Sequence, residues 1–226
     1  MALAVSSSQS FAAPSAQSAP EELAARQAIS ANVASFSYRD QARWDELRDL
    51  FTSDGTISIS WYAGPVQGFV ELSKEMSKNS KTSTKHLLSA PRITVCGERA
   101  ISETDATIMV RNDTGPFEVD ITSYARFLDT FEHSSDGAWR IRSRVGIYEK
   151  DRMDSVGPSV LFAITYPFFP LSRYPRELKH LAYGIERSGL PLAPQIVLSG
   201  SDDEQRVKRA AWDWSGCGAS SGARLP

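Results

Sequence analysis

The spacing of hydrophobic side chains changes along the chain, and each spacing predicts a different kind of element. Apolar residues first recur every three to four positions, with Ile29, Val33 and Phe36 on one stripe, which predicts an amphipathic helix. We expect order to begin at Pro20, since proline and the two glutamates after it favour a first helical turn. A second helical segment spans residues 44–51 and ends at a Ser-Asp-Gly turn signal.

Beyond this turn the spacing becomes two, which is typical of strands. The predicted strands are Thr56–Tyr62, Thr84–Val95, Ala100–Val110, Phe117–Phe131 and Trp139–Tyr148, with a short helix over Phe69–Met76. The last four strands are separated by short turn sequences rich in Gly, Asp, Asn and Ser, which predict antiparallel hairpins. Strands of ten or more residues predict a strongly curved sheet.

This order of elements predicts an α+β fold. The N-terminal helices cover one face of a curved antiparallel sheet, and the hollow between them is the natural pocket. Beyond the sheet, helices over Tyr174–Arg187 and Asp202–Trp214 form an extension, the second opened by Ser201 as N-cap. The predicted divisions are a disordered leader (1–20), a main domain (21–152), a C-terminal extension packed on that domain (153–214) and a flexible tail (215–226).

Composition narrows the class of protein. The 226 residues carry 25 Lys and Arg against 27 Asp and Glu, so the surface is not basic enough to predict a nucleic-acid partner. No run approaches the roughly 18 apolar residues of a membrane helix, and Met1–Val5 is too short for the core of a secretory signal. Two cysteines cannot form a disulfide framework, and three histidines make a zinc site improbable. We therefore expect a cytoplasmic protein without a metal.

Nucleotide, phosphate and serine-hydrolase motifs are missing from the sequence. It contains no GxGxxG, no Walker A loop, no GxSxG elbow and no HExxH. We therefore expect no cofactor and no hydride or phosphoryl transfer.

Asp40 and His86 are the first candidates for chemistry. Asp40 continues the apolar stripe of the first helix, where a carboxylate faces inward and needs a partner. His86 shares one strand face with Leu88, which suggests that it also points inward. Together they would form a general base, with the carboxylate fixing one tautomer of the imidazole. The alternatives stay open: Asp40 as the cap of the helix near Arg43, and His86 as a hydrogen-bonded core residue.

The long strands supply further polar candidates. Tyr124 and Arg126 share one face of a strand and could polarise a carbonyl or hold an enolate. The arginines at 140, 142 and 144 are interpreted as a solvated sheet face, and Trp61 as part of the pocket rim. Of the remaining histidines, His133 lies beside a turn, and the one at 180 is predicted on the exposed side of its helix.

Several short segments, taken in order, resemble the SnoaL-like/NTF2-like superfamily and its scytalone dehydratase-type branch. The resemblance covers about residues 21–152 and is carried by Tyr38–Leu47, Leu50–Gly55, Thr84–His86 and Asp136–Ile141. It implies a cone-shaped α+β barrel, often oligomeric, that works without cofactor or metal. It also implies that His86 removes a proton while Asp40 orients it, and that Tyr38, Trp61, Tyr124 and Arg126 contact the substrate.

The chain departs from the dehydratase pattern at three positions. Arg39 stands where the dehydratases have a tyrosine, Val110 lies near the position of a further histidine, and Trp61 occupies the place of a second tyrosine. The resemblance therefore implies proton abstraction from a small, largely apolar, cyclic or polyketide-like molecule, by a lyase, isomerase or cyclase that forms a dimer or trimer. The alternatives are a non-catalytic ligand-binding or assembly module and the small subunit of a ring-hydroxylating oxygenase.

Overall fold

The computed structural model describes residues 18–79, 82–113 and 117–217. Its helical segments are α1 (Ala19–Ala34), η1 (Ser35–Gln41), α2 (Trp44–Asp49), α3 (Val66–Asn79), α4 (Val160–Thr165), η2 (Tyr166–Phe168), η3 (Leu171–Arg173), α5 (Lys179–Arg187) and α6 (Asp202–Ser215). Its strands are β1 (Phe51–Ile59), β2 (Tyr62–Pro65), β3 (Ser83–Leu88), β4 (Arg92–Cys96), β5 (Arg99–Asp113), β6 (Glu118–His133), β7 (Trp139–Ser155) and β8 (Val197–Leu198). Most of the predicted leader (1–17) and most of the predicted tail (218–226) lie outside the described residues.

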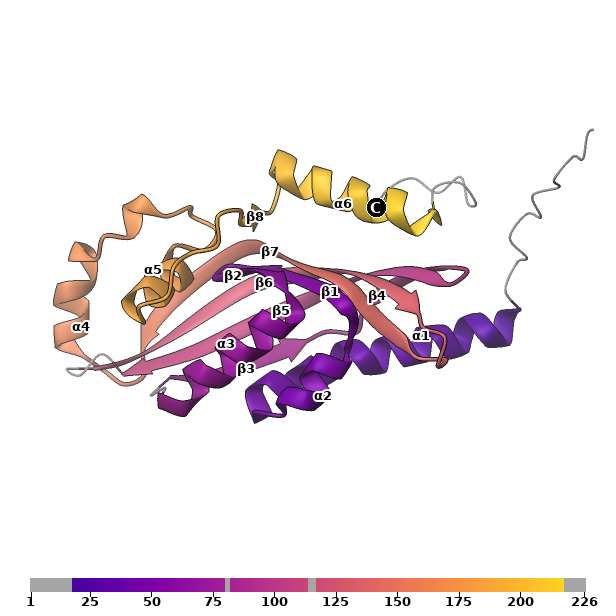
Figure 1. Ribbon diagram of the computed structural model, residues 1–226. Coiled ribbons are helices and arrows are strands. Elements are labelled where there is room, and N and C mark those ends of the chain that lie inside the picture. The colour runs from indigo at the N-terminus through magenta and orange to yellow at the C-terminus, as the bar shows by residue number, and fades with distance from the viewer. Residues whose placement is uncertain (1–17, 80–81, 114–116, 218–226) are drawn as a thin grey trace, which may run out of the picture.

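The strands form one curved sheet in the order β2-β1-β7-β6-β5-β3, with β4 also paired to β5 and β8 to β7. The predicted α+β fold with a curved sheet is confirmed, and the sheet is open, with β2 and β3 at its edges (Figure 1). The predicted antiparallel pairing is confirmed for β3, β4, β5, β6 and β7, but β1 and β8 both pair with β7 in parallel. Hairpin turns dictate the direction only of successive strands, and neither of these pairs is joined by a turn.

The strand predicted over residues 84–95 is divided in two. β3 and β4 both pair with β5, but the register moves by one residue between the Leu88–Ala106 and Arg92–Glu103 pairs. Pro91 lies in the break, where its missing N–H prevents a continuous ladder. The interruption is a bulge that adds to the curvature of the sheet.

The first helices cover the concave face of the sheet (Figure 1). Ile29, Val33 and Phe36, the stripe predicted from their spacing, are at most 1% exposed. They pack in one cluster with inward-facing side chains of the sheet such as Phe127 and Phe131. α1 begins at Ala19, so the end of the predicted leader already belongs to this helix.

The C-terminal helices have two separate positions. α6 lies over the convex face, where its buried Ala211 joins a cluster with Leu128 and Ile147 of the sheet (Figure 1). α5 instead packs beside concave-face residues of β5 and β6. The predicted cap of α6 is confirmed, since the Ser201 side chain accepts the Glu204 backbone N–H.

Both cysteines take part in one disulfide. Cys96 at the end of β4 bonds Cys217, two residues beyond α6, across 121 residues of sequence. The start of the predicted flexible tail is therefore attached to the sheet. Disulfides persist mainly in oxidising compartments, so the cysteines do not support the predicted cytoplasmic location. Within the described ranges, no helix is both long and apolar enough to span a membrane.

Candidate active site

A buried carboxylate–imidazole pair lies where η1 meets β3. The Asp40 Oδ1 atom is 2.7 Å from His86 Nδ1, and Asp40 Oδ2 accepts the His86 backbone N–H at 2.6 Å. The two side chains are only 4% and 8% exposed. Because one carboxylate holds both the ring and the backbone of the histidine, the imidazole has a single orientation.

The local fold explains why Asp40 faces inward. α1 tightens into η1 without a break, so Asp40 remains on the side of the helix that faces the sheet. η1 ends at Gln41, and its C-cap Ala42 has a left-handed backbone (φ 57°) that turns the chain away two residues after the carboxylate. The alternative in which Asp40 caps the next helix is wrong, since Arg43 is the N-cap of α2 and provides no side-chain cap.

The protonation states follow from these contacts. A carboxylate only accepts hydrogen bonds, so His86 donates from Nδ1 and its lone pair lies on Nε2. Burial lowers the pKa of His86 below its ordinary value, helped by the charges of Arg39 and Arg144 and opposed by Asp40. Burial would raise the pKa of Asp40, but the bonds from His86 and the charge of Arg39 outweigh it and lower that pKa. At neutral pH the pair is a carboxylate beside a neutral imidazole.

His86 and Asp40 line a cavity of about 760 Å³ between η1, α3, the concave face of the sheet and α5. This volume is within the roughly 300–1,000 Å³ of small-molecule sites. The centre of the Phe69 ring lies 5.5 Å from the ring centre of Trp61 and 6.4 Å from that of Phe36, so the three rings form one aromatic wall. Other polar lining residues are Arg39, Ser60, Ser73, Glu75, Ser77, Thr82, Thr84, Asn112 and Ser188. A wall that combines aromatic and aliphatic side chains with polar groups suits a compact organic molecule that carries oxygen.

Tyr148 is a polar lining residue that the sequence reasoning missed. Its ring is fully buried and its hydroxyl accepts the Ser60 backbone N–H at 2.8 Å, which leaves the hydroxyl hydrogen to donate. Gly146 makes room for it, because a Cβ there would lie 3.3 Å from the Tyr148 oxygen. Burial raises the pKa of Tyr148, so the hydroxyl stays protonated. The sequence shows a tyrosine near the end of a predicted strand, but it does not show on which face of the sheet the side chain lies.

Ser73 of α3 adds a second polar group that the sequence did not single out. It is only 3% exposed and lines the cavity. Its Oγ has no hydrogen-bond partner among the residues that the structure describes. A buried hydroxyl without a partner is costly, so a ligand oxygen or nitrogen would satisfy it.

The prediction of a solvated face is wrong for Arg144. Its side chain is fully buried, and its guanidinium donates two 2.7 Å hydrogen bonds to the two carboxylate oxygens of Asp129. The guanidinium also lies 4.3 Å from the ring centre of Phe36, which itself contacts His86 edge-on. The register between β6 and β7 shifts directly after Thr130, and this bulge explains the error. A bulge reverses which alternate residues of β7 face inward.

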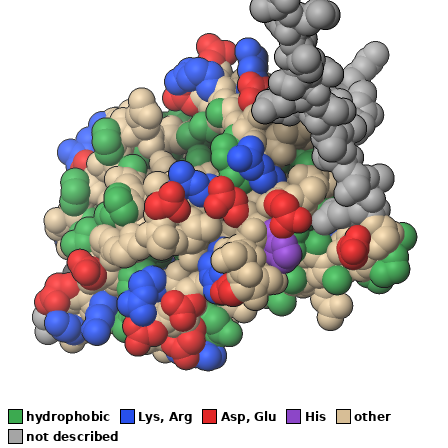
Figure 2. Space-filling model, turned by 45° about the vertical axis from the view of Figure 1, so that its right-hand side comes forward, with side chains coloured by type: hydrophobic (Ala, Val, Ile, Leu, Met, Phe, Trp, Pro, Cys, Tyr) green, Lys and Arg blue, Asp and Glu red, His purple; other side chains and the backbone are tan. Residues whose placement is uncertain are grey.

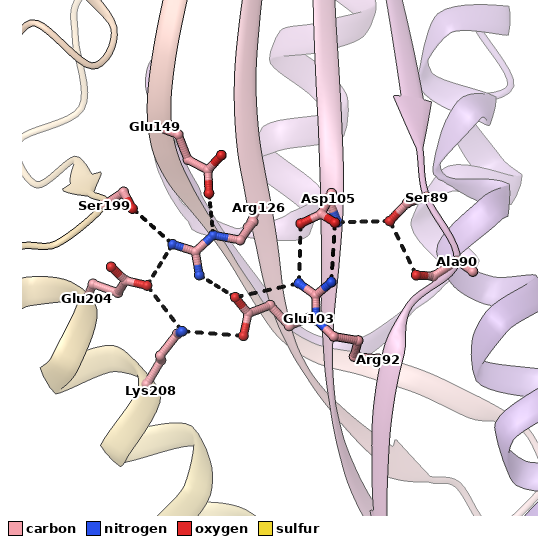
Figure 3. Close-up of polar contacts among 10 residues, drawn as sticks. All are labelled: Ser89, Ala90, Arg92, Glu103, Asp105, Arg126, Glu149, Ser199, Glu204 and Lys208. Carbon is pink, nitrogen blue, oxygen red and sulfur yellow. Dashed lines mark hydrogen bonds and ion pairs between the residues drawn. The ribbon is translucent and has the colours of Figure 1, made fainter. Parts of the chain in front are cut away.

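Arg126 does not reach this cavity. It lies on the convex face, where its guanidinium donates to Glu149 at 2.6 Å, to Glu204 of α6 at 2.7 Å and to Glu103 (Figure 3). These carboxylates account for its charge and join α6 to the sheet. The predicted substrate contact from Arg126 is therefore corrected to a surface ion network: the alternation along its strand was right, but the face chosen as the pocket was wrong.

The remaining predicted contacts divide between the cavity and other places. Trp61 lines the cavity, as described above. Tyr124 shares the convex face with Arg126, and Lys150 lies 5.1 Å from its ring centre. Tyr38 lies outside the lining, with the Arg43 guanidinium stacked 4.0 Å from its ring centre. Neither tyrosine is brought to the Asp40–His86 pair.

The prediction of an exposed histidine at 180 is also wrong. His180 is 4% exposed, and its Nδ1 lies 2.8 Å from Asp151 Oδ1. Its Nε2 accepts from the Tyr166 hydroxyl at 2.7 Å. Both ring nitrogens of His180 thus have protein partners, and these hydrogen bonds connect α5 and η2 to β7. By contrast, no hydrogen bond among the described residues occupies Nε2 of His86, which leaves that nitrogen for a ligand.

Comparison with known proteins agrees with this architecture. Residues 21–145, more than half of the chain, match the SnoaL-like domain. This chain belongs to the SnoaL-like family. The predicted membership of the SnoaL-like/NTF2-like superfamily is therefore confirmed, and it covers both Asp40 and His86.

Curated relatives come from fungi. The chain is 33% identical over 150 residues to pea pathogenicity protein 2 of Fusarium vanettenii, covering 65% of this chain and 63% of that protein. It is 29% identical over 151 residues to a PEP2-like protein of the same fungus, with the same coverage. The chain thus spans less than two thirds of the length of these relatives.

Solved structures share the fold at low identity. Rv3472 of Mycobacterium tuberculosis, a protein of unknown function, matches with a TM-score of 0.51 at 14% identity, over 78% of this chain and 96% of that one. LinA matches with a TM-score of 0.50 at 18% identity, over 63% and 94%. These likenesses show the shared fold.

Proposed function

We propose that this SnoaL-like protein is an enzyme that needs no cofactor and abstracts a proton from a small, largely apolar, cyclic or polyketide-like natural-product intermediate. The observation that carries the proposal is the buried Asp40–His86 pair in the cavity lining, with no hydrogen bond at His86 Nε2 among the described residues. The reaction class is a dehydratase-type lyase, or an isomerase or cyclase with the same first step.

The chemistry begins with the neutral imidazole as general base. The proton passes from a substrate carbon to His86 Nε2, and the electron pair of the broken C–H bond forms a new double bond. In an elimination the leaving group departs with its bonding pair; in an isomerisation the proton returns to another carbon. Asp40 holds the ring and stabilises the imidazolium that forms, which is a positioning role.

Polar groups across the cavity suit the oxygen of such a substrate. Tyr148 offers its hydroxyl hydrogen, and the Ser60 N–H that donates to the same oxygen makes this hydroxyl a stronger donor. Arg39 places a positive charge 3.6 Å from the Asp40 carboxylate and also lines the cavity. These groups would stabilise negative charge that develops on a carbonyl as the proton leaves.

Proton abstraction is measurable before the natural substrate is known. We expect the wild-type protein to exchange the α-hydrogens of 2-tetralone, an apolar cyclic ketone, for deuterium in D₂O, as followed by NMR. His86→Ala should lower the catalysed exchange by about 10²–10⁴-fold, the usual contribution of a general base. His133→Ala is the matched control, since this histidine is a surface residue bound to Glu98 and a backbone carbonyl.

Two outcomes separate an enzyme from a binding module. Exchange that depends on His86 supports the proposal. If 2-tetralone binds but exchanges no faster than in buffer, or equally fast in His86→Ala, the pair is not a general base and the chain is better described as a non-catalytic ligand-binding module. The predicted dimer or trimer stays a prediction, and size-exclusion chromatography with light scattering tests it.

A further inference from the structure

A second cavity adjoins the first. It measures about 420 Å³ and lies between the ends of β6 and β7, α4 and α5. Residues that line both cavities are Thr82, Asn112, Ile121, Gly184 and Ser188. The two cavities are therefore neighbours on either side of these residues, and the Asp40–His86 pair lines only the first.

The walls of the second cavity are suited to hydrocarbon. The sheet provides Val119 and Met153, both at least nine-tenths buried, and the C-terminal extension provides Leu161 and Phe169. Arg187 is the one charged side chain among its described lining residues, and neither histidine nor carboxylate lines it. A wall of this kind binds by excluding water and contributes no acid or base.

Gly184 of α5 lies at the junction between the two cavities. A Cβ at this position would lie 2.7 Å from Ile121 Cδ1 and 3.4 Å from Asn112 Nδ2, so any side chain would intrude between these walls. Glycine is otherwise unfavourable in the middle of a helix. The absent Cβ leaves room for Ile121 Cδ1 in the wall that both cavities share.

We propose that the substrates of this site carry an extended aliphatic chain on a cyclic, oxygen-bearing head, with the ring beside His86 and the chain in the second cavity. The inference rests on the proposed function for the place of the ring. The aliphatic chain is assigned to the second cavity because that cavity has an apolar lining, shares five lining residues with the first cavity and has no catalytic groups. The C-terminal extension thereby acquires a role in selecting substrates by chain length.

Equilibrium binding tests this without turnover. The probes are 2-naphthol and its 6-butyl and 6-octyl derivatives, whose fluorescence reports the Kd. We expect affinity to rise with chain length in the wild-type protein, by up to about fourfold for each methylene that becomes fully buried. The measured quantity is the ratio of the Kd of 2-naphthol to that of the octyl derivative within each variant.

Two variants on α4 form a matched pair. Thr165 lines the second cavity and Ala163 is exposed on the other side of the same helix. Thr165→Phe should bring the ratio close to one, whereas Ala163→Phe should keep the wild-type ratio. Gly184→Ala, which narrows the junction and favours the helix, gives a second block if Thr165→Phe does not fold.

The outcomes are distinct from those of the proposed function. A wild-type ratio near one, or a high ratio that survives both Thr165→Phe and Gly184→Ala, would overturn the assignment of the chain to this cavity. A ratio lowered by Ala163→Phe alone would place the chain on the outer surface of α4, which also overturns it. If instead the ratio behaves as expected while His86→Ala leaves deuterium exchange unchanged, the binding proposal stands and the catalytic one fails.

Discussion

His86 lies between groups that shift its protonation in opposite directions. Burial and the charges of Arg39 and Arg144 favour the neutral ring, while the Asp40 carboxylate favours the charged one. Together these effects lower the pKa of His86 below the ordinary value of 6.5. The base is therefore ready at neutral pH, and a single substitution of a neighbour should change its titration.

An NMR titration of the His86 ring measures this balance. In Asp40→Asn the one group that raises the pKa of His86 is lost while burial and both arginines remain, so that pKa should fall clearly below its wild-type value. Asp45→Asn is the control, because it removes the same charge from a side chain that is 83% exposed. Identical curves for wild type and Asp40→Asn would contradict the coupling.

The buried ion pair of Arg144 and Asp129 gives a second prediction for single residues. Asp129→Ala leaves a fully buried guanidinium without its partner, so the free energy of unfolding should fall by about 3–5 kcal/mol. Urea unfolding followed by circular dichroism measures it.

The chain contains a matched control for this variant. Arg111 and Asp120 form a similar two-bond pair at the surface, where Asp120→Ala should cost only about 0–1 kcal/mol. If the two variants lost equal free energy of unfolding, burial would not decide the strength of the Arg144–Asp129 pair.

At the scale of elements, α6 is held to the sheet by contacts that the sequence pattern does not display. Glu204 and Lys208 of this helix join the carboxylate network around Arg126 (Figure 3). The disulfide then fastens the end of the helix to β4. The convex face is thus covered without contributing to the cavity.

Removing the disulfide should loosen this cover. We expect the double variant Cys96→Ser/Cys217→Ser to lose about 2–4 kcal/mol of unfolding free energy, because the unfolded chain regains the freedom of a long loop. Urea unfolding with and without dithiothreitol measures it. The reductant should destabilise the wild-type protein and leave the double variant unchanged; equal stability of both proteins under oxidising conditions would refute the prediction.

At the scale of the whole molecule, basic and acidic residues nearly balance, at 25 and 27. Figure 2 shows acidic and basic side chains interspersed over the visible face, in keeping with a net charge of −2. The effect of pH on stability therefore depends on individual groups rather than on a charged patch. His86, Asp40 and the surface residue Asp136 all have a lowered pKa, to about 2 for Asp136.

These shifts predict acid instability in two steps. The unfolded chain binds more protons than the native one wherever a native pKa is lowered, so stability rises with pH in that window. On acidification we expect a first loss just below the ordinary His value of 6.5 and a second below the ordinary Asp value of 3.8. Denaturation curves across this range test it, and His86→Gln should lack the first step; a first step that persists in that variant would have another source.

Much of this molecule could be predicted from local pattern. The buried stripe of α1, the α+β class and the Ser201 cap all follow from spacing and turn chemistry, because periodicity reports which side of an element is buried. The inward direction of Asp40 and His86 came from the same rule, applied to a helix and to the start of a strand. None of these inferences needed a distant part of the chain.

Tertiary structure decided the rest. Alternation along β6 grouped Tyr124 with Arg126 correctly, but only the placement of α1 and α6 shows which side of a two-faced sheet holds the cavity. Bulges, the parallel strand pairs, the disulfide and the second cavity likewise depend on segments far apart in the sequence. Pattern is a local property of the chain, whereas a cavity is made by elements that meet only after folding.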